Sequence, residues 1–254
     1  WPMASHAVVQ PASVSEHGFI DASTHRAELP AAYNRYQRVE KADAQREGEV
    51  AVLRPLFATA WLIADFMQQA GDFGARTMLL SSASSKTAYA TAFCLKRRAA
   101  ATRIVGATSP PRREWASALG VFDDVIAYDA LSSLPADAPT IYIDFAGDAA
   151  FRRAVHEHWR DQLAYSCSVG GTHHAALGAG GGLPGPKPQL FFAPTQMQKR
   201  SAPPPQGLGR AGMLAIGKNL QAVAELQSRL IAAQQTMERD YWKLREIETR
   251  YRLV

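Results

Sequence analysis

The sequence is poor in cysteine and in long apolar runs. Its 254 residues contain two cysteines, Cys94 and Cys167, and both stand in apolar segments. They resemble small buried hydrophobic residues, so neither a disulfide framework nor a zinc site is indicated. No apolar stretch approaches the length of a bilayer-spanning helix, and the first residues lack the basic-then-apolar order of a signal peptide. We therefore expect a cytoplasmic protein without a membrane partner.

Charge is also sparse and scattered. Charged residues make up 20% of the chain, and 28 Lys and Arg against 23 Asp and Glu leave a net charge of +5. This surplus favours anionic ligands, but the basic residues form no stripe, which argues against a nucleic-acid partner. The hydrophobic fraction of 47% is ample for a globular core.

The glycine fingerprints of nucleotide-binding loops are missing from the turn over residues 81–87. Residues 77–80 are a short apolar run that predicts a buried strand, and 88–95 suit a buried helix. The turn between them has neither G-x-G-x-x-G nor the glycines of G-x-x-x-x-G-K-[ST]. It carries hydroxyls and one cation instead: Ser81, Ser82, Ser84, Ser85, Lys86 and Thr87.

Two interpretations of this turn stay open. In the first, the hydroxyls, Lys86 and the helix N-terminus cradle the diphosphate of a dinucleotide, as in the first crossover of a Rossmann domain. In the second, the hydroxyls merely cap helix N–H groups. A turn without glycine leaves little room for backbone near a phosphate, which weakens an ATPase interpretation more than a dinucleotide one.

The order of predicted elements favours the first interpretation. A helix is expected over 49–69 with Pro55 near its first turn, after a polar linker at 41–48. Beyond the turn, strands alternate with helices, which predicts an α/β fold with a doubly wound parallel sheet of Rossmann type. The further strands are expected at 103–107, 122–128, 140–144, 162–168 and 189–193, and the helices at 112–119 and 149–159.

Ligands of such a sheet lie beyond the carboxyl ends of the strands. The second strand is followed by hydroxyls and arginines rather than by an acidic residue, which suits the 2′-phosphate of NADP better than the free ribose of NAD. Alternatively, the two arginines are ordinary solvated helix residues. The candidate residues here are Thr108, Ser109, Arg112 and Arg113.

The fourth and fifth strands are followed by small residues that would let a cofactor pass close to the backbone. Asp144 and Gly147 follow the fourth strand, although Asp144 could simply cap a turn. Val169 and Gly170 follow the fifth. The next pair, His173 and His174, points in opposite directions if extended and so does not indicate a metal site. Either His173 faces a nicotinamide, or both are solvated.

The segment 25–36 is rich in groups that could line a pocket. Its Tyr33 and Asn34, with His173, are the weak candidates for binding substrate or donating a proton. The alternative is an irregular loop that packs its tyrosines on a core.

Several motifs follow one another along residues 1–200: HRAELPAAYNRY at 25–36, RPLFATAWLI at 54–63, SSASSKTA at 81–88, IDFAG at 143–147, SVGGTHH at 168–174 and LPGPKPQLFFAP at 183–194. Together they resemble the domain-of-unknown-function family 2855, which is similar to the quinone-reductase branch of the medium-chain dehydrogenase/reductase superfamily. The resemblance implies an NADP-type Rossmann domain at 46–200 and a chaperonin-10-like substrate domain, of which 1–45 would be a remnant.

This resemblance implies an NADP-dependent oxidoreductase that transfers hydride to or from a small carbonyl, enone or quinone. The alternative is a non-catalytic nucleotide-binding or interaction protein on the same scaffold. The family pattern is lost at 201–254, where a Pro/Gly linker precedes a long helix over 214–254.

The helix predicted over 214–254 has an apolar seam that only Asp240 interrupts. Its heptad spacing predicts a coiled coil and hence a homo-oligomer. The alternatives are an amphipathic helix packed on its own domain and a non-native tail produced by a change of reading frame. The main seam residues are Val223, Leu230, Met237, Leu244 and Tyr251.

Overall fold

The computed structural model describes residues 7–30, 33–38, 44–98, 102–170, 182–201, 239–240, 242–244 and 246. The chain divides into two compact units, 1–51 and 52–254. The boundary falls inside helix α1 (Ala44–Gln69).

The first unit contains a small antiparallel sheet. Its strands β1 (Pro11–Ser15), β2 (Gly18–Asp21) and β3 (Arg35–Gln37) lie in the order β1-β2-β3. The Asp21 carboxylate, which is buried, accepts hydrogen bonds from the backbone N–H groups of Gln10 and Ser23, both at 3.0 Å. Hydrogen bonding by this carboxylate therefore ties the end of β2 to the residues beside it.

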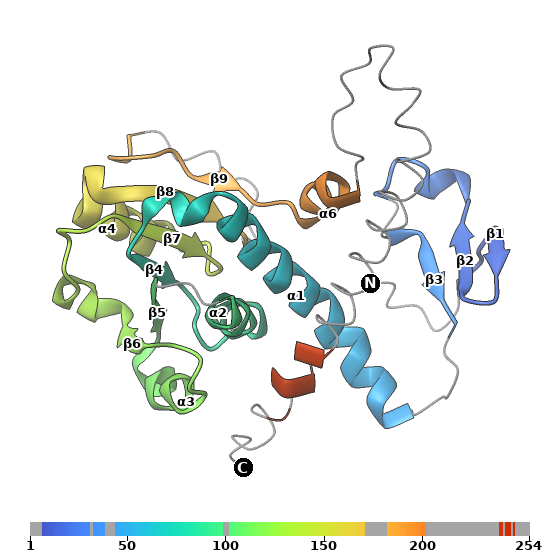
Figure 1. The fold of residues 1–254 in the computed structure, drawn as a ribbon, viewed down its shortest axis with the longest axis horizontal. Coiled ribbons are helices and arrows are strands. Elements are labelled where there is room, and N and C mark those ends of the chain that lie inside the picture. Colours follow the sequence, from blue (N-terminus) through green and yellow to red (C-terminus); the bar gives the residue numbers. More distant parts are fainter. Residues whose placement is uncertain are drawn as a thin grey trace, which may run out of the picture. The chain divides into compact units, whose positions relative to one another are not determined.

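The second unit is built on a six-stranded sheet in which every neighbouring pair is parallel (Figure 1). The strand order is β6-β5-β4-β7-β8-β9. Counted from β4, this is the order 3-2-1-4-5-6 of a Rossmann fold, so the predicted fold class is confirmed. The strands are β4 (Thr77–Leu80), β5 (Arg103–Thr108), β6 (Asp124–Ala127), β7 (Thr140–Asp144), β8 (Leu163–Ser168) and β9 (Gln189–Leu190).

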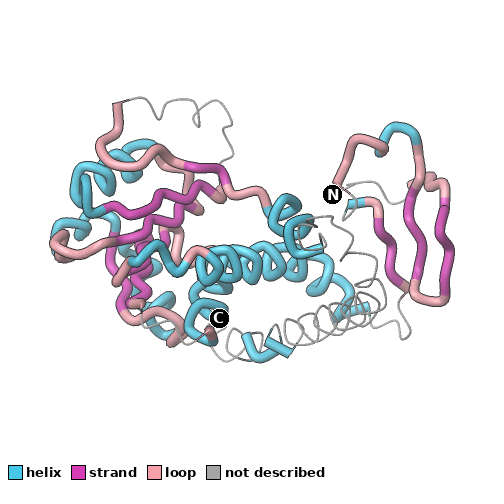
Figure 2. Tube along the Cα trace, turned by 45° about the horizontal axis from the view of Figure 1, so that its top comes forward, coloured by secondary structure: helices cyan, strands magenta, loops and turns pink. Residues whose placement is uncertain are grey.

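Helices cover both faces of this sheet, as parallel strands require (Figure 2). One face carries Ile141 and Ile143 and packs in a cluster with residues of α1 and α2. The other carries Tyr142 and packs with residues of α4 and of the 3-10 segment η5 (Tyr128–Ser133). The remaining helices are α2 (Lys86–Arg97), α3 (Arg113–Ala118), α4 (Ala149–Trp159) and α6 (Ala193–Ser201), and the short 3-10 segments of this unit are η3 (Gly71–Gly74), η4 (Pro110–Arg112) and η6 (Arg160–Gln162).

The start of α1 differs from the prediction. The helix begins at Ala44, so the expected linker over 41–48 is wrong from residue 44 onward, and Pro55 lies inside the helix rather than in its first turn. Gln45, Arg46 and Glu47 are good helix formers, which is why the polar stretch continues the helix.

Cys94 and Cys167 are buried and unpaired, as predicted. Burial raises the pKa of the Cys94 thiol to about 12, so it stays protonated at neutral pH. Within the described parts of the chain, no helix is both long and apolar enough to span a bilayer.

The described residues near the C-terminus contact their own unit. Asp240 pairs with Arg97 of α2 at 2.8 Å between Oδ1 and Nε, and Leu244 is 6% exposed in the cluster that includes α2. Because Leu244 belongs to the predicted seam and Asp240 is the residue that interrupts it, these two contacts favour the alternative in which this part packs on its own domain. The rest of the helix predicted over 214–254 lies outside the described residues.

Candidate nucleotide-binding site

The turn between β4 and α2, residues 81–85, lies at the carboxyl edge of the sheet. We call it the elbow. It follows the strand that stands between β5 and β7, which is where the strand order of the sheet reverses. Open α/β sheets bind their ligands at such a reversal. The sequence therefore places its hydroxyl-rich turn where this fold class receives a nucleotide.

The backbone of the elbow turns sharply without a glycine of its own. Ser82 has φ +53°, in the left-handed region that glycine favours. Its N–H donates to the hydroxyl of Tyr128 at 3.0 Å, and the N–H of Ala83 donates to the carbonyl of Ala107 at 3.0 Å. A Cβ on Gly106 of β5 would lie 2.8 Å from the Ala83 Cβ. The room that the elbow needs thus comes from a glycine in the neighbouring strand.

Four hydroxyls of the elbow and of the first turn of α2 divide into two groups. Ser81 is buried and hydrogen-bonded inside the chain, and Ser85 caps α2 by accepting from the Ala88 N–H at 3.3 Å. Ser84, half-buried, accepts from the Thr108 hydroxyl at 3.3 Å, and Thr87 is also half-buried. The capping interpretation therefore describes Ser85, while Ser84 and Thr87 keep partial access to solvent.

Lys86 begins α2 and is exposed. No hydrogen bond or ion pair joins its ammonium to another residue in the described part of the chain. The N–H groups of Lys86 and Thr87 belong to the first helical turn and have no acceptor four residues earlier within α2. This end of α2 thus combines a free cation with donor groups, which together suit a phosphate.

After the end of β5, the two predicted arginines differ in their contacts. Thr108 is buried and Ser109 half-buried, while Arg112 and Arg113 are both exposed. Arg113 donates from Nε to the carbonyl of Val125 in β6 at 2.9 Å, so it also holds α3 against the sheet. Among the described residues, none hydrogen-bonds or ion-pairs with the Arg112 guanidinium, which leaves it able to meet a ligand.

Asp144, at the end of β7, is not placed to contact a cofactor directly. It is 0% exposed, and its Oδ1 accepts from the Gly147 N–H at 2.9 Å and from the Ser81 hydroxyl at 3.0 Å. Its Oδ2 accepts from Arg152 Nε at 2.9 Å. The turn-capping alternative thus describes Asp144, and Gly147 completes the turn with φ +71°.

The backbone after β8 lies tightly against the same turn. The N–H groups of Val169 and Gly170 donate to the carbonyl of Asp144 at 2.9 and 3.1 Å. A Cβ on Gly170 would lie 2.1 Å from the Phe145 carbonyl oxygen, so a larger residue cannot occupy this position without a backbone shift. His173 and His174 lie outside the described residues.

Tyr33 and Asn34 belong to the first unit. Asn34 is buried and exchanges hydrogen bonds with Arg26, whose Nε donates to its Oδ1 at 3.0 Å, while Tyr33 is exposed. The hydrogen bonds of Asn34 stabilise the loop around it, and the contacts of Tyr33 indicate no catalytic role. The catalytic roles of both residues therefore stay a prediction.

Sequence reasoning missed two polar side chains on the buried face of α4. Arg152 and His156, one turn apart, are both buried beside the apolar Val155 and Trp159. His156 Nδ1 donates to the carbonyl of Pro184 at 2.9 Å, so the neutral ring accepts from Ser166 at Nε2, 3.0 Å away. Burial lowers the pKa of His156, and the Pro184 carbonyl opposes this in part. The signal was present, because both residues share the helical face of the apolar ones.

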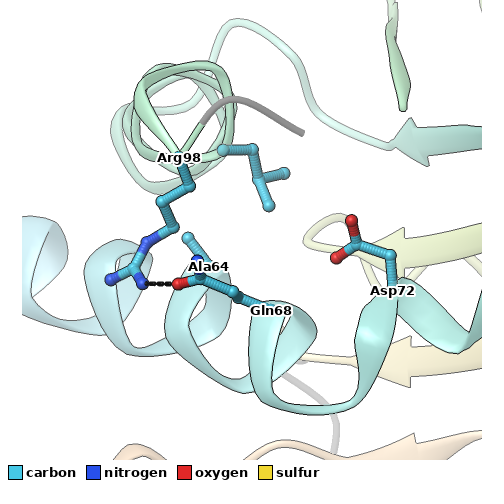
Figure 3. A pocket seen from close by; sticks show the side chains of 5 residues that line it. Ala64, Gln68, Asp72 and Arg98 are labelled. Carbon is cyan, nitrogen blue, oxygen red and sulfur yellow. Dashed lines mark hydrogen bonds between the residues drawn. The ribbon is translucent and has the colours of Figure 1, made fainter. Parts of the chain in front are cut away.

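A small pocket lies at the other edge of the sheet, near the end of α2 (Figure 3). Its volume is about 80 Å³, and the Arg98 guanidinium beside it donates to Gln68 Oε1 at 2.5 Å. Pockets for nucleotide-sized ligands are several times larger. It is therefore not the candidate site. The lining residues are Ala64, Gln68, Asp72, Leu95 and Arg98.

Comparison with known proteins gives one partial sequence match and several structural ones. Over 42 residues the chain is 52% identical to Protein CrtJ of Rhodobacter capsulatus, which covers 16% of this chain and 9% of that protein. The quinone oxidoreductase from Coxiella burnetii is 14% identical with a TM-score of 0.45, over 66% of this chain and 52% of that one.

The yhdH oxidoreductase from Salmonella enterica in complex with NADP is 10% identical with a TM-score of 0.37, over 54% of this chain and 41% of that one. The CurK enoyl reductase is 9% identical with a TM-score of 0.45, over 86% of this chain and 63% of that one. A family model described as a protein of unknown function (DUF2855) matches residues 1–239. The match continues past residue 200, so the expectation that the family pattern is lost over 201–254 is wrong as far as residue 239. Since this match spans more than nine tenths of the sequence, the chain belongs to the DUF2855 family.

Proposed function

We propose that this protein is an NADP-dependent oxidoreductase of the medium-chain dehydrogenase/reductase type. The observation that carries the proposal is the position of the elbow, which joins β4 to α2 where a sheet of order 3-2-1-4-5-6 reverses direction. When bound, the nicotinamide would supply hydride transfer, here to or from a small carbonyl, enone or quinone.

The elbow supports the diphosphate half of this proposal. Lys86 offers an exposed charge, Ser84 and Thr87 offer half-buried hydroxyls, and the first turn of α2 offers backbone N–H groups. A charge-assisted bond from an ammonium to a phosphate is among the stronger hydrogen bonds available. We therefore place the diphosphate against the first turn of α2.

The end of β5 supports NADP over NAD. No acidic residue occurs between Thr108 and Arg113, and Arg112 is exposed beside the half-buried Ser109. An acidic residue in this place would bind the ribose hydroxyls of NAD and repel a 2′-phosphate. An exposed guanidinium instead matches that phosphate in shape and charge.

A non-catalytic nucleotide-binding protein is the second candidate. Asp144, a buried titratable group at the carboxyl end of β7, makes its hydrogen bonds inside the chain. Since these bonds leave it no proton transfer to a substrate, binding without turnover fits this edge equally well.

Titration of the full chain with NADPH and NADH, followed through the fluorescence of the reduced nicotinamide, tests the proposal. We expect tighter binding of NADPH, and Arg112→Ala should weaken NADPH binding more than NADH binding. Consumption of NADPH with a small quinone or enone would support the enzyme, and binding without consumption would support the second candidate. Absence of binding to either nucleotide would contradict both.

A further inference from the structure

A buried hydrogen-bond network joins the loops after β4 and β7 to helix α4. The Ser81 hydroxyl donates to Asp144 Oδ1 at 3.0 Å and accepts from the N–H groups of Phe145 and Ala146 at 2.9 and 3.1 Å. Arg152 Nη2 lies 2.7 Å from Asp144 Oδ2, and the side chains of this ion pair are 5% and 1% exposed. Three segments far apart in the sequence thus meet at one carboxylate.

The network fixes backbone rather than filling space. Ser81 gathers two consecutive N–H groups of the loop after β7, and the Asp144 carbonyl accepts the N–H groups of Val169 and Gly170 from the loop after β8. All three loops lie at the edge where we place the nucleotide. Their relative positions therefore depend on Asp144, and the orientation of Asp144 depends on Arg152.

A buried ion pair such as Arg152–Asp144 is an unusual means of stabilising the loops at the carboxyl edge. Taking two charges out of water carries a desolvation penalty that their attraction seldom outweighs, and apolar residues of similar volume often stabilise a fold as well or better. The pair has a directional property that apolar residues lack, because its hydrogen bonds specify one geometry. Such a geometry is what a preorganised binding edge requires.

We propose that Arg152 is a positioning residue for the dinucleotide site. Acting through Asp144 and Ser81, it holds the loops after β4 and β7 in the form that receives the diphosphate. The inference rests on the proposed function, since it concerns the same site. It assigns a role to a buried side chain that contacts one oxygen of the carboxylate, while the elbow contacts the other.

Three variants at one helix test this role. Arg152→Met removes the charge and the donors, Arg152→Lys keeps the charge, and Arg153→Met is the matched control, because Arg153 is 52% exposed and has a weak i,i+4 contact with Glu157. We expect Arg152→Met to weaken NADPH binding by about tenfold, Arg152→Lys to recover part of that loss, and Arg153→Met to bind as the wild type does. Each dissociation constant is measured well below the variant's own unfolding temperature.

Loss of stability must be kept apart from loss of positioning. Arg152→Met leaves a buried carboxylate unpaired and could prevent folding, so Ser81→Ala is the second variant, which keeps the Arg152–Asp144 pair but removes the bond to the elbow. A weaker affinity in folded Ser81→Ala, or partial rescue by Arg152→Lys, supports the inference. A purely structural role would lower the unfolding temperature and leave the affinity of the folded protein unchanged.

The outcomes separate the two proposals. If the wild type binds NADPH, folded Ser81→Ala binds it as tightly, and Arg152→Lys binds no better than Arg152→Met, the positioning role is overturned while the proposed function stands. If the wild type binds no nicotinamide nucleotide, the proposed function fails and this inference fails with it.

Discussion

Among the residues of the proposed site, Lys86 is the one whose replacement is easiest to interpret. It begins α2, is exposed, and contributes to no ion pair within the described residues. Replacing it by Ala should leave the fold intact and weaken NADPH binding by about 1–3 kcal/mol, since a hydrogen bond to a charged group is lost. The measurement is the NADPH dissociation constant, which should rise by roughly one to two orders of magnitude.

Lys96 provides the control for this substitution. It lies about 15 Å further along the same helix, at 1.5 Å per residue, and pairs with Asp123 at 3.0 Å on the surface. Lys96→Ala removes the same charge from α2 and should change NADPH affinity little. Equal losses from both variants would show that the net charge matters and that Lys86 makes no specific contact.

His156 makes the stability of the fold depend on pH. Its pKa is lowered in the folded protein, chiefly by burial, so the folded state favours the neutral ring. The stabilisation is therefore complete above the unfolded pKa of about 6.5 and is lost as the pH falls towards the lowered value. We expect the free energy of unfolding to decrease between pH 7.5 and 5.5.

The variant His156→Gln should show a smaller decrease over the same range, measured by denaturant unfolding. Carboxylates titrate mainly below this range, and His17, whose side chain is 87% exposed, offers a control in His17→Gln. An identical pH dependence in wild type and His156→Gln would contradict the assignment to this histidine.

At the residue scale, the sequence predicted a hydroxyl-rich turn that ends at Lys86, and the structure places this turn between β4 and α2. The sequence leaves the binding of a phosphate by these side chains a prediction. It could not separate Ser81, which is buried, from Ser84, which is not, because that depends on which strand lies beside β4. The Arg152–Asp144 pair was missed for the same reason, since α4 and β7 meet only in the folded sheet.

At the scale of elements, the close packing of β5 against the elbow gives a direct test of the structure. Gly106→Ala would place a Cβ 2.8 Å from Ala83 Cβ and 3.0 Å from Phe122 Cδ1. Overpacking of this kind costs about 1–3 kcal/mol. We expect a lower Tm by thermal unfolding, by about 2–4 °C for each kcal/mol. The double variant Ala83→Gly with Gly106→Ala should recover part of the loss, and an unchanged Tm in the single variant would contradict this packing.

The docked residues near the C-terminus give a second prediction for an element. Leu244→Ala should lower the Tm of the full chain, because truncating a buried leucine costs about 2–5 kcal/mol, whereas Lys243→Ala at an exposed neighbouring position should not. Light scattering should give the same mass for the wild type and Leu244→Ala. A lower mass at an unchanged Tm would instead indicate that Leu244 contacts a second copy.

Element types were easier to predict than element ends. The short apolar runs at β4, β5 and β7 were predicted correctly because strands buried on both faces need continuous apolar sequence. The start of α1 was not predicted correctly. A polar stretch of good helix formers can extend a helix or form a linker, and its composition alone does not distinguish the two. The heptad seam was detected, but its spacing alone does not show which surface the seam packs against. The acidic residue at seam position 240 is explained by its ion pair with Arg97, which the sequence did not predict.

At the scale of the whole molecule, the position of the proposed nucleotide site depends on the topology of one sheet. Alternating strands and helices predicted a parallel arrangement, but the order β6-β5-β4-β7-β8-β9 requires the structure, because local sequence does not determine on which side of β4 each later strand is added. That order places the ends of β4, β5 and β7 around one reversal. The proposed nucleotide site follows from this convergence.

Hydrogen–deuterium exchange of the full chain with and without saturating NADPH tests this claim most directly. We predict slower exchange at 81–88, 108–113 and 144–147, the segments after β4, β5 and β7, and no change in the first unit's strands β1 and β2. Unchanged exchange in all three segments, or protection confined to other parts of the chain, would contradict a dinucleotide site at the carboxyl edge of this sheet.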